Sequence, residues 1–294
     1  MNNIVKKENL QINLDKLDAQ RNLYSRVKIY AHLLTFLCVV VPVLIAITKI
    51  VWTETTLILR GAVVYSFVLL FLRPCLKSYV GTLQNLAARI QQQFDCDVFD
   101  LEWNEPLCGK QPDLEQIFAK KTGKKIDGLQ NWYEVIVEKL DRLEAIVVCQ
   151  RINVTYDKSL RETFSLIIKI VVGIAGLFVL MIGFLHNSTL WDWFLNAIVP
   201  VSPVISWYMD LHKQNHKNVM ALEKLNQLID SALRKLRNGD NIEEQNVISI
   251  QNFMFIHRSS SYVIPDFIYK LRRNKHEEAT RYSVAHIVEE LVHG

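Results

Sequence analysis

Apolar residues in this chain gather in four blocks, and the charged residues lie between the blocks instead of alternating with them. A helix needs roughly 20 mostly apolar residues to cross the hydrocarbon core of a bilayer. Four stretches come close to this requirement: Ile29–Ile50, Thr56–Leu72, Phe164–Leu185 and Leu190–Tyr208. Short linkers join the first to the second and the third to the fourth. The pattern therefore predicts an all-α integral membrane protein with four transmembrane helices in two hairpins and helical cytoplasmic regions.

The fourth block contains two prolines, which transmembrane helices tolerate when neighbours satisfy the freed backbone groups. We therefore expect a kink near Pro200. Other polar positions within the blocks are sparse, and the main ones are His32, Arg60, Lys169 and Asn196. Arg60 and Lys169 lie about one turn inside their blocks, so their long side chains can reach the nearer interface. A dedicated transporter usually places ionisable groups at mid-membrane, so this pattern argues against one.

The blocks divide the chain into five regions. They are an N-terminal helix at 1–28, a first hairpin at 29–72, a central helical region at 73–163, a second hairpin at 164–208 and a C-terminal helical region at 209–294. Lys and Arg flank the hairpins on the side of these helical regions and are nearly absent from the linkers within the hairpins. Because cytoplasmic flanks carry the excess positive charge, we expect both termini and the central region in the cytoplasm.

The regions outside the membrane are predicted to be helical from their apolar spacing. We expect helices at about 8–28, 76–94, 112–121, 129–161, 242–257 and 266–291, with a turn at 103–110 and a loop at 259–261. The first of these runs directly into the first span, and the helix of 129–161 leads into the third. The opening residues are polar and the first block is long, so no cleavable signal peptide is expected.

A helix continuous with the fourth block carries a second pattern. Apolar and amide side chains recur there at spacings of four and three, which is typical of a heptad seam. The positions are Leu211, Asn215, Asn218, Leu222, Leu225, Ile229, Ala232 and Leu236. Such a seam either drives homo-oligomerisation or packs against the protein's own helices, and the sequence favours neither.

Composition narrows the class of protein. Of 294 residues, 50% are hydrophobic and 22% are charged, as in a membrane protein with sizeable aqueous parts. The net charge of +4 is too small to suggest a partner that is a nucleic-acid polymer. The five cysteines form no CxxC pair and are odd in number, which indicates neither a disulfide framework nor a zinc site.

No catalytic motif is visible, because the chain lacks a GxxxxGK[ST] loop, a GxSxG elbow and an HExxH zinc motif. We therefore expect neither an enzyme nor a cofactor. His212 and His216 share a helix face, but no third ligand is evident, so no metal site is expected. One basic loop either binds a phosphate-bearing ligand or anionic lipid headgroups, or is only solvated; its lysines are Lys120, Lys121, Lys124 and Lys125.

Three parts of the chain carry a resemblance to a known family. They are the segment Ala19–Lys28, the segments Ile90–Asp95 and Asp97–Asn104, and a C-terminal group made of Leu225–Asp230, Gln251–Arg258 and Val263–Tyr269. Together they resemble the SMODS-associating four-transmembrane effectors of bacterial conflict systems, over nearly the whole length of the chain.

The resemblance implies a pore-forming effector of the bacterial inner membrane. A nucleotide second messenger, such as a cyclic oligonucleotide made by a neighbouring synthase, would activate it, and permeabilisation would then arrest or kill the infected cell. The family has no established catalytic residues. A nucleotide needs cations and stacking surfaces, so the expected contacts are Arg21, Tyr24, Arg26, Lys28, Trp103 and the four loop lysines. The alternative is a membrane-tethered scaffold whose cytoplasmic helices recruit a partner.

Overall fold

The structure is a computed structural model that describes residues 2–51, 56–123, 128–185, 189–193 and 199–293. Helices and connecting turns make up these described residues, with no strand among them. The elements are α1 (Ile4–Glu8), α2 (Gln11–Thr35), the π-helix η1 (Phe36–Val40), α3 (Val41–Val51), α4 (Thr56–Phe99), α5 (Glu105–Cys108), α6 (Leu114–Phe118), the 3-10 helix η2 (Val135–Lys139), α7 (Arg142–Leu185), α8 (Leu190–Trp193), α9 (Val199–Arg237), α10 (Glu244–Ser260) and α11 (Asp266–His293).

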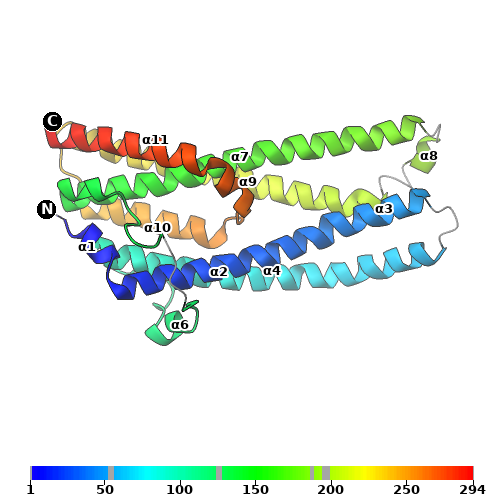
Figure 1. Cartoon of the computed structure of the whole chain (residues 1–294), viewed down its shortest axis with the longest axis horizontal. Coiled ribbons are helices and arrows are strands. Elements are labelled where there is room, and N and C mark those ends of the chain that lie inside the picture. Colours follow the sequence, from blue (N-terminus) through cyan, green and yellow to red (C-terminus); the bar gives the residue numbers. More distant parts are fainter. Residues whose placement is uncertain (1, 52–55, 124–127, 186–188, 194–198, 294) are drawn as a thin grey trace.

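The long helices run side by side along the molecule (Figure 1). The continuous run of α2, η1 and α3 lies beside α4, and α7 lies beside α9. α3 and the start of α4 lie at the same end as α8 and the end of α7, while both chain termini lie at the opposite end (Figure 1). The described residues are thus all-α.

Helix length explains why this fold has a membrane part and an aqueous part. α4 and α7 each contain 44 residues, which is about 66 Å at ~1.5 Å per residue. A hydrocarbon core is only about 30 Å thick, so each helix extends well beyond it. The predicted helix of 76–94 is accordingly not a separate element but the second half of α4. The second predicted span therefore also continues as a helix into the aqueous bundle.

Two described stretches are long and apolar enough to cross a membrane, Gln11–Ile45 and Arg60–Phe99. Only 11% and 6% of their apolar windows are buried, unlike the core helix of a soluble protein. Both belong to the first predicted hairpin. The second hairpin, at 164–208, includes residues outside the described part of the chain, so its two spans stay predictions.

Two helices begin later than the apolar spacing predicted. Leu10 is extended and separates α1 from α2. The helix expected at 129–161 is instead a 3-10 turn followed by α7, because Leu140 is extended. The Glu144 carboxylate then accepts a hydrogen bond of 3.0 Å from the Asp141 backbone N–H. This is half of a capping box, a motif that marks a helix start.

The described part of α9 begins at Val199, directly after residues outside the described part of the chain, so the kink expected near Pro200 stays a prediction. One expectation about a helix end is wrong. The loop predicted at 259–261 is largely helical, since Ser259 and Ser260 complete α10 and Ser261 is its C-cap.

The main hydrophobic core lies in the half of the bundle that contains the termini, where α1, α4, α7, α9, α10 and α11 meet. Phe94, Ile146 and Ile229 are fully buried in it. Burying a side chain of this kind contributes about 1.5–3 kcal/mol relative to leaving it exposed. This core fixes the aqueous halves of both hairpins in one bundle.

Candidate ligand-binding site

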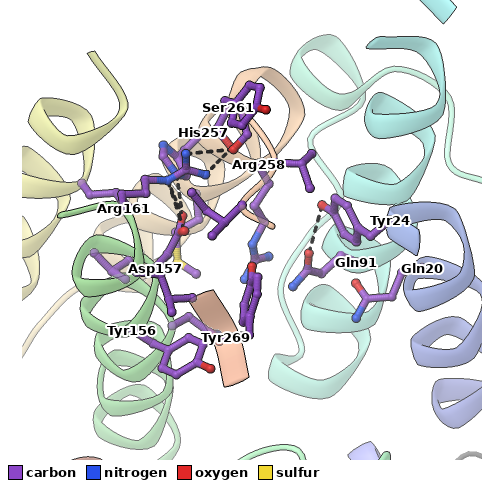
Figure 2. A pocket seen from close by; sticks show the side chains of 18 of the residues that line it. Gln20, Tyr24, Gln91, Tyr156, Asp157, Arg161, His257, Arg258, Ser261 and Tyr269 are labelled. Carbon is purple, nitrogen blue, oxygen red and sulfur yellow. Dashed lines mark hydrogen bonds and ion pairs between the residues drawn. The ribbon is translucent and has the colours of Figure 1, made fainter. Parts of the chain in front are cut away.

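A cavity of about 760 Å³ lies inside the aqueous bundle. α2 and α4 form one wall, and α7, α10 and α11 form the other (Figure 2). Its size matches sites that hold small organic ligands. Cationic, aromatic and amide side chains line it, so it offers contacts for both charge and ring systems.

The wall formed by α7 and α10 carries a buried ionic group. Arg161 Nε lies 3.1 Å from Asp157 Oδ1, and His257 Nε2 lies 2.7 Å from Asp157 Oδ2. Arg161 also donates to the Tyr262 carbonyl at 2.9 Å and the Ser261 hydroxyl at 2.8 Å. Burial alone would raise the pKa of Asp157, but the charge of Arg161 and the hydrogen bond from His257 outweigh it and lower that pKa. Asp157 therefore stays ionised and holds Arg161 in the wall.

A second buried group couples α10 to α4 behind the cavity. Arg258, a cavity residue, forms an ion pair with the buried Asp95 carboxylate. Asp95 also accepts hydrogen bonds from the Tyr133 hydroxyl at 2.7 Å and the Gln251 amide at 2.8 Å. Burial opposes the charged form of Arg258, but the Asp95 carboxylate overcomes this and raises the Arg258 pKa. The cation is thus fixed and fully compensated in this structure.

Lys28 and Asp266 close the side of the cavity nearest the predicted membrane. Lys28 of α2 forms an ion pair with Asp266, the first residue of α11. The Lys28 ammonium also lies 4.6 Å from the centroid of the Tyr269 ring, within cation–π range. The Asp266 side chain is 65% exposed, so solvent weakens the pair. An anionic ligand can therefore compete with Asp266 for Lys28.

The wall formed by α2 and α4 is neutral and polar. Tyr24 donates to the Gln91 amide oxygen at 3.3 Å, and burial raises the pKa of Tyr24 to about 12, so its ring stays uncharged. The Gln20 side chain reaches the same cavity (Figure 2), and its buried Oε1 has no hydrogen-bond partner among the described residues. A buried unpaired amide oxygen is costly, so a ligand that donates a hydrogen bond there is favoured.

Three of the predicted ligand contacts line this cavity: Arg21, Tyr24 and Lys28. Arg26 is exposed on α2 and does not line it. Trp103 does not line this cavity either; its indole N–H donates to the Gly109 carbonyl at 2.9 Å and its ring packs against the core.

The basic loop lies away from the cavity. Lys121 pairs with Asp15 of α2 at 2.8 Å, and Lys120 lines a second pocket between α4 and α6. Lys124 and Lys125 lie outside the described residues. The structure therefore does not join the basic loop to the Arg21, Tyr24 and Lys28 group.

Sequence reasoning missed the residues that the C-terminal helices bring to the cavity, namely His257, Arg258 and Tyr269. The signal was present, because these residues belong to segments 251–258 and 263–269, which carry the family resemblance. Arg161 is one of the basic residues that precede the third predicted span, and its place in the cavity wall depends on the packing of α10 against α7.

The heptad seam of α9 packs inside the protein. Leu222, Leu225 and Ile229 are buried in the main core, Leu211 is buried in a smaller cluster, and Asn215 donates to the Arg161 carbonyl at 3.1 Å. Asn218 is buried and Leu236 packs at the edge of the same core. Between the two alternatives, the structure favours intramolecular packing, and the seam is not an open surface for a second copy.

The predicted polar positions of the spans lie on helix surfaces. His32, Arg60 and Lys169 are exposed in this structure, and Asn196 lies outside the described residues. Within the described part of the chain, no three His, Cys, Asp or Glu side chains gather where they could hold a metal ion.

Long helices that run from an apolar hairpin into a bundle with a ligand-sized cavity define a helical membrane protein. Residues 2–287 match the model of the SMODS-associating 4TM effector domain, so the chain belongs to that family. It is also 24% identical to a probable CBASS effector molecule of Bacillus cereus (strain VD146), over 94% of this chain and 95% of that protein. No solved structure matches the chain. The family is one of four-transmembrane effectors and is not a known enzyme family.

Proposed function

We propose that this effector permeabilises the bacterial inner membrane after a nucleotide second messenger binds in the cavity between α2, α4, α7, α10 and α11. The observation that carries the proposal is continuity. α2, α4 and α7 line the cavity and run on into the predicted spans without a break in the described chain. A ligand that shifts these helices in the bundle can move the spans directly.

The cavity suits an anionic ligand that carries aromatic bases. Tyr24, Tyr156 and Tyr269 supply rings for stacking, while Arg21, Lys28 and Lys270 supply positive charge near the opening. The unpaired Gln20 oxygen can accept a hydrogen bond from the amino group of a base. A cyclic oligonucleotide combines these features in one small molecule.

Activation would follow an exchange of partners at Lys28. The ligand phosphate replaces Asp266 beside the ammonium, and the link between α2 and α11 is lost. The two hairpins, with their termini on the cytoplasmic side, then separate, and several copies assemble to open the bilayer.

Two substitutions with opposite expected effects test the binding step. Protein in detergent is titrated with a panel of cyclic dinucleotides and trinucleotides by calorimetry. Lys28→Met should weaken binding about tenfold, because one charge-assisted contact is lost. Asp266→Asn should strengthen binding by two- to fivefold, about the worth of an exposed ion pair. Lys224→Gln, an exposed lysine of α9, is the control and should leave affinity unchanged.

Permeabilisation is tested separately on dye-loaded liposomes that contain the protein. Addition of a nucleotide that binds should release the dye, and Lys28→Met should shift the response to higher concentration. Binding without release would support the alternative, a membrane-tethered scaffold. Failure of every nucleotide to bind, or equal effects of Lys28→Met and Lys224→Gln, would remove the cavity as the sensing site.

A further inference from the structure

A second pocket, of about 740 Å³, lies on a different face of α4, between that helix and α6. Ser78, Thr82, Asn85 and Arg89 line it at spacings of four, three and four, so they share one helix face. The α4 residues of the first cavity, Gln84 and Gln91, lie seven apart on another face. The two sites are therefore separate.

Two cations line this second pocket, and no acidic residue lines it. The Arg89 guanidinium donates to the Lys110 carbonyl through one terminal nitrogen, and its buried Nε has no hydrogen-bond partner among the described residues. Lys120 has no ion pair within the described part of the chain. In the first cavity, by contrast, Lys28, Arg161 and Arg258 each have a carboxylate partner. No residue that lines the second pocket therefore compensates its positive charge.

α6 and the start of the basic loop are held firmly against α2, which fixes the outer wall of this pocket. Ile117 is buried against α2 and α4. Asn22 donates to the Lys120 carbonyl at 2.7 Å, and the Thr122 backbone N–H donates to Asp18 at 3.0 Å. Figure 1 shows α6 as a small lobe on the side of the bundle formed by α2 and α4. The backbone at Lys120 is therefore fixed in position at the edge of the pocket.

One end of the pocket lies near the predicted membrane, and the cations lie at the other end. Ser78 follows Arg73, the first residue after the predicted second span, by five residues, which is about 7.5 Å along a helix, whereas Arg89 follows it by 16 residues, about 24 Å. Gly81 leaves open space at this level, since a side chain there would meet nothing within 4 Å. The Ser78 hydroxyl and the Asn85 amide add donors to the two cations, while the Thr82 hydroxyl donates to the Ser78 carbonyl at 3.1 Å.

We infer that the pocket between α4 and α6 binds a phosphate group, with Arg89 and Lys120 as its charged contacts. A phosphate accepts several hydrogen bonds from guanidinium and ammonium groups, and such charge-assisted bonds are strong. The phosphate belongs either to an anionic lipid headgroup or to a soluble phosphate ester, and both present the same chemistry to these residues.

The test uses the full chain in two settings. In the first, the protein is placed in phosphatidylcholine nanodiscs with or without phosphatidylglycerol, and native mass spectrometry measures the retained anionic lipid. In the second, delipidated protein in neutral detergent is titrated calorimetrically with inorganic phosphate. Retention of phosphatidylglycerol alone assigns the site to lipid, whereas binding of inorganic phosphate assigns it to a soluble ester. Each result supports the inference only if substitution of the two pocket cations lowers binding and the control substitution does not.

Lys120→Gln and Arg89→Gln should each reduce occupancy about tenfold, and Lys224→Gln should not. Arg89→Gln also loses the bond to Lys110, so Lys120→Gln, which breaks no contact in the described structure, keeps the test clear if the first variant folds poorly. Binding of neither probe, or equal occupancy in Lys120→Gln and Lys224→Gln, overturns the inference. Because none of these residues lines the first cavity, the result is independent of nucleotide sensing.

Discussion

Arg73 of α4 and Asp210 of α9 form an ion pair with 2.5 Å between guanidinium nitrogen and carboxylate oxygen, and it joins the two hairpins beside the predicted membrane surface. Lys77, one turn further along α4, lies 3.4 Å from the same carboxylate. The pair formed by Lys28 and Asp266 has the same arrangement, with the cation on α2 and the carboxylate on α11. At both points a helix that runs into the first hairpin supplies cations and a helix of the C-terminal region supplies an anion, so opposite charges hold these two parts together.

Weakening this contact should favour the open state. Asp210→Asn is expected to raise dye leakage without ligand by two- to fivefold, because an exposed pair contributes about 0.5–1 kcal/mol. Arg73→Gln should act in the same direction, and the double variant should add little, since both remove one interaction. Asp230→Asn, at an exposed position of the same helix, is the control. Additive effects of Asp210→Asn and Arg73→Gln would show that the pair does not couple the hairpins.

The buried group around Asp157 should matter for folding more than any surface pair. Arg161→Met would leave the Asp157 carboxylate without its main cation, and removing one partner of a buried pair costs about 3–5 kcal/mol. Thermal unfolding in detergent should show a large loss of stability. Arg273→Met removes an exposed pair with Glu277 and should cost less than about 1 kcal/mol. Similar losses in the two variants would mean that Arg161 is not the compensating charge.

Much of this fold could be predicted because membrane spans and amphipathic helices leave strong periodic signals. The runs of α4 and α9, and the positions of α10 and α11, follow from apolar spacing. The start of α7 could not be predicted in this way, because Leu140 and Leu143 extend the apolar pattern through the break. The deciding signal was the short Asp141-x-x-Glu144 capping motif, which is local and weaker than the pattern around it.

The candidate site was less predictable, because its walls come from segments distant in the sequence. Tyr24 and Lys28 lie in one helical segment and were recognised together. Arg258 meets Asp95 across 163 positions, and no spacing rule relates them. The basic loop shows the limit of charge density as a signal, since Lys120 and Arg21 are both basic candidates in the sequence but line different pockets in the fold.

The α9 seam gives a prediction about packing. Leu222→Ala removes a side chain that is 2% exposed in the main core, and such truncations typically cost about 2–5 kcal/mol. Leu228→Ala, at a position of the same helix that is 46% exposed, should change stability by less than about 0.5 kcal/mol. Thermal unfolding and light scattering on each variant check this. If Leu222→Ala instead dissociates an oligomer while leaving protomer stability intact, the seam is intermolecular after all.

Glu8 gives a prediction about pH. Its side chain is buried, with one oxygen accepting the Tyr133 backbone N–H at 3.0 Å and the other without a partner among the described residues. Burial raises its pKa from 4.5 to about 8, with a further contribution from Glu138, although the Tyr133 N–H opposes the shift. Between these two values the folded state holds a proton that the unfolded state has released. Stability should therefore fall as pH rises through this window, by at most about 1.4 kcal/mol per pH unit, and level off above about pH 8.

Glu8→Gln removes this titration while keeping an oxygen that can accept the Tyr133 N–H. The variant should gain stability over the natural chain as pH rises from about 5 to 8, and the midpoint of thermal unfolding measures the difference. Glu115→Gln, at an exposed carboxylate on α6, controls for the loss of one negative charge and should give a difference that does not change with pH. Parallel profiles for the natural chain and Glu8→Gln would show that Glu8 is ionised in the fold, and that the contact between α1 and the Tyr133 segment does not depend on its proton.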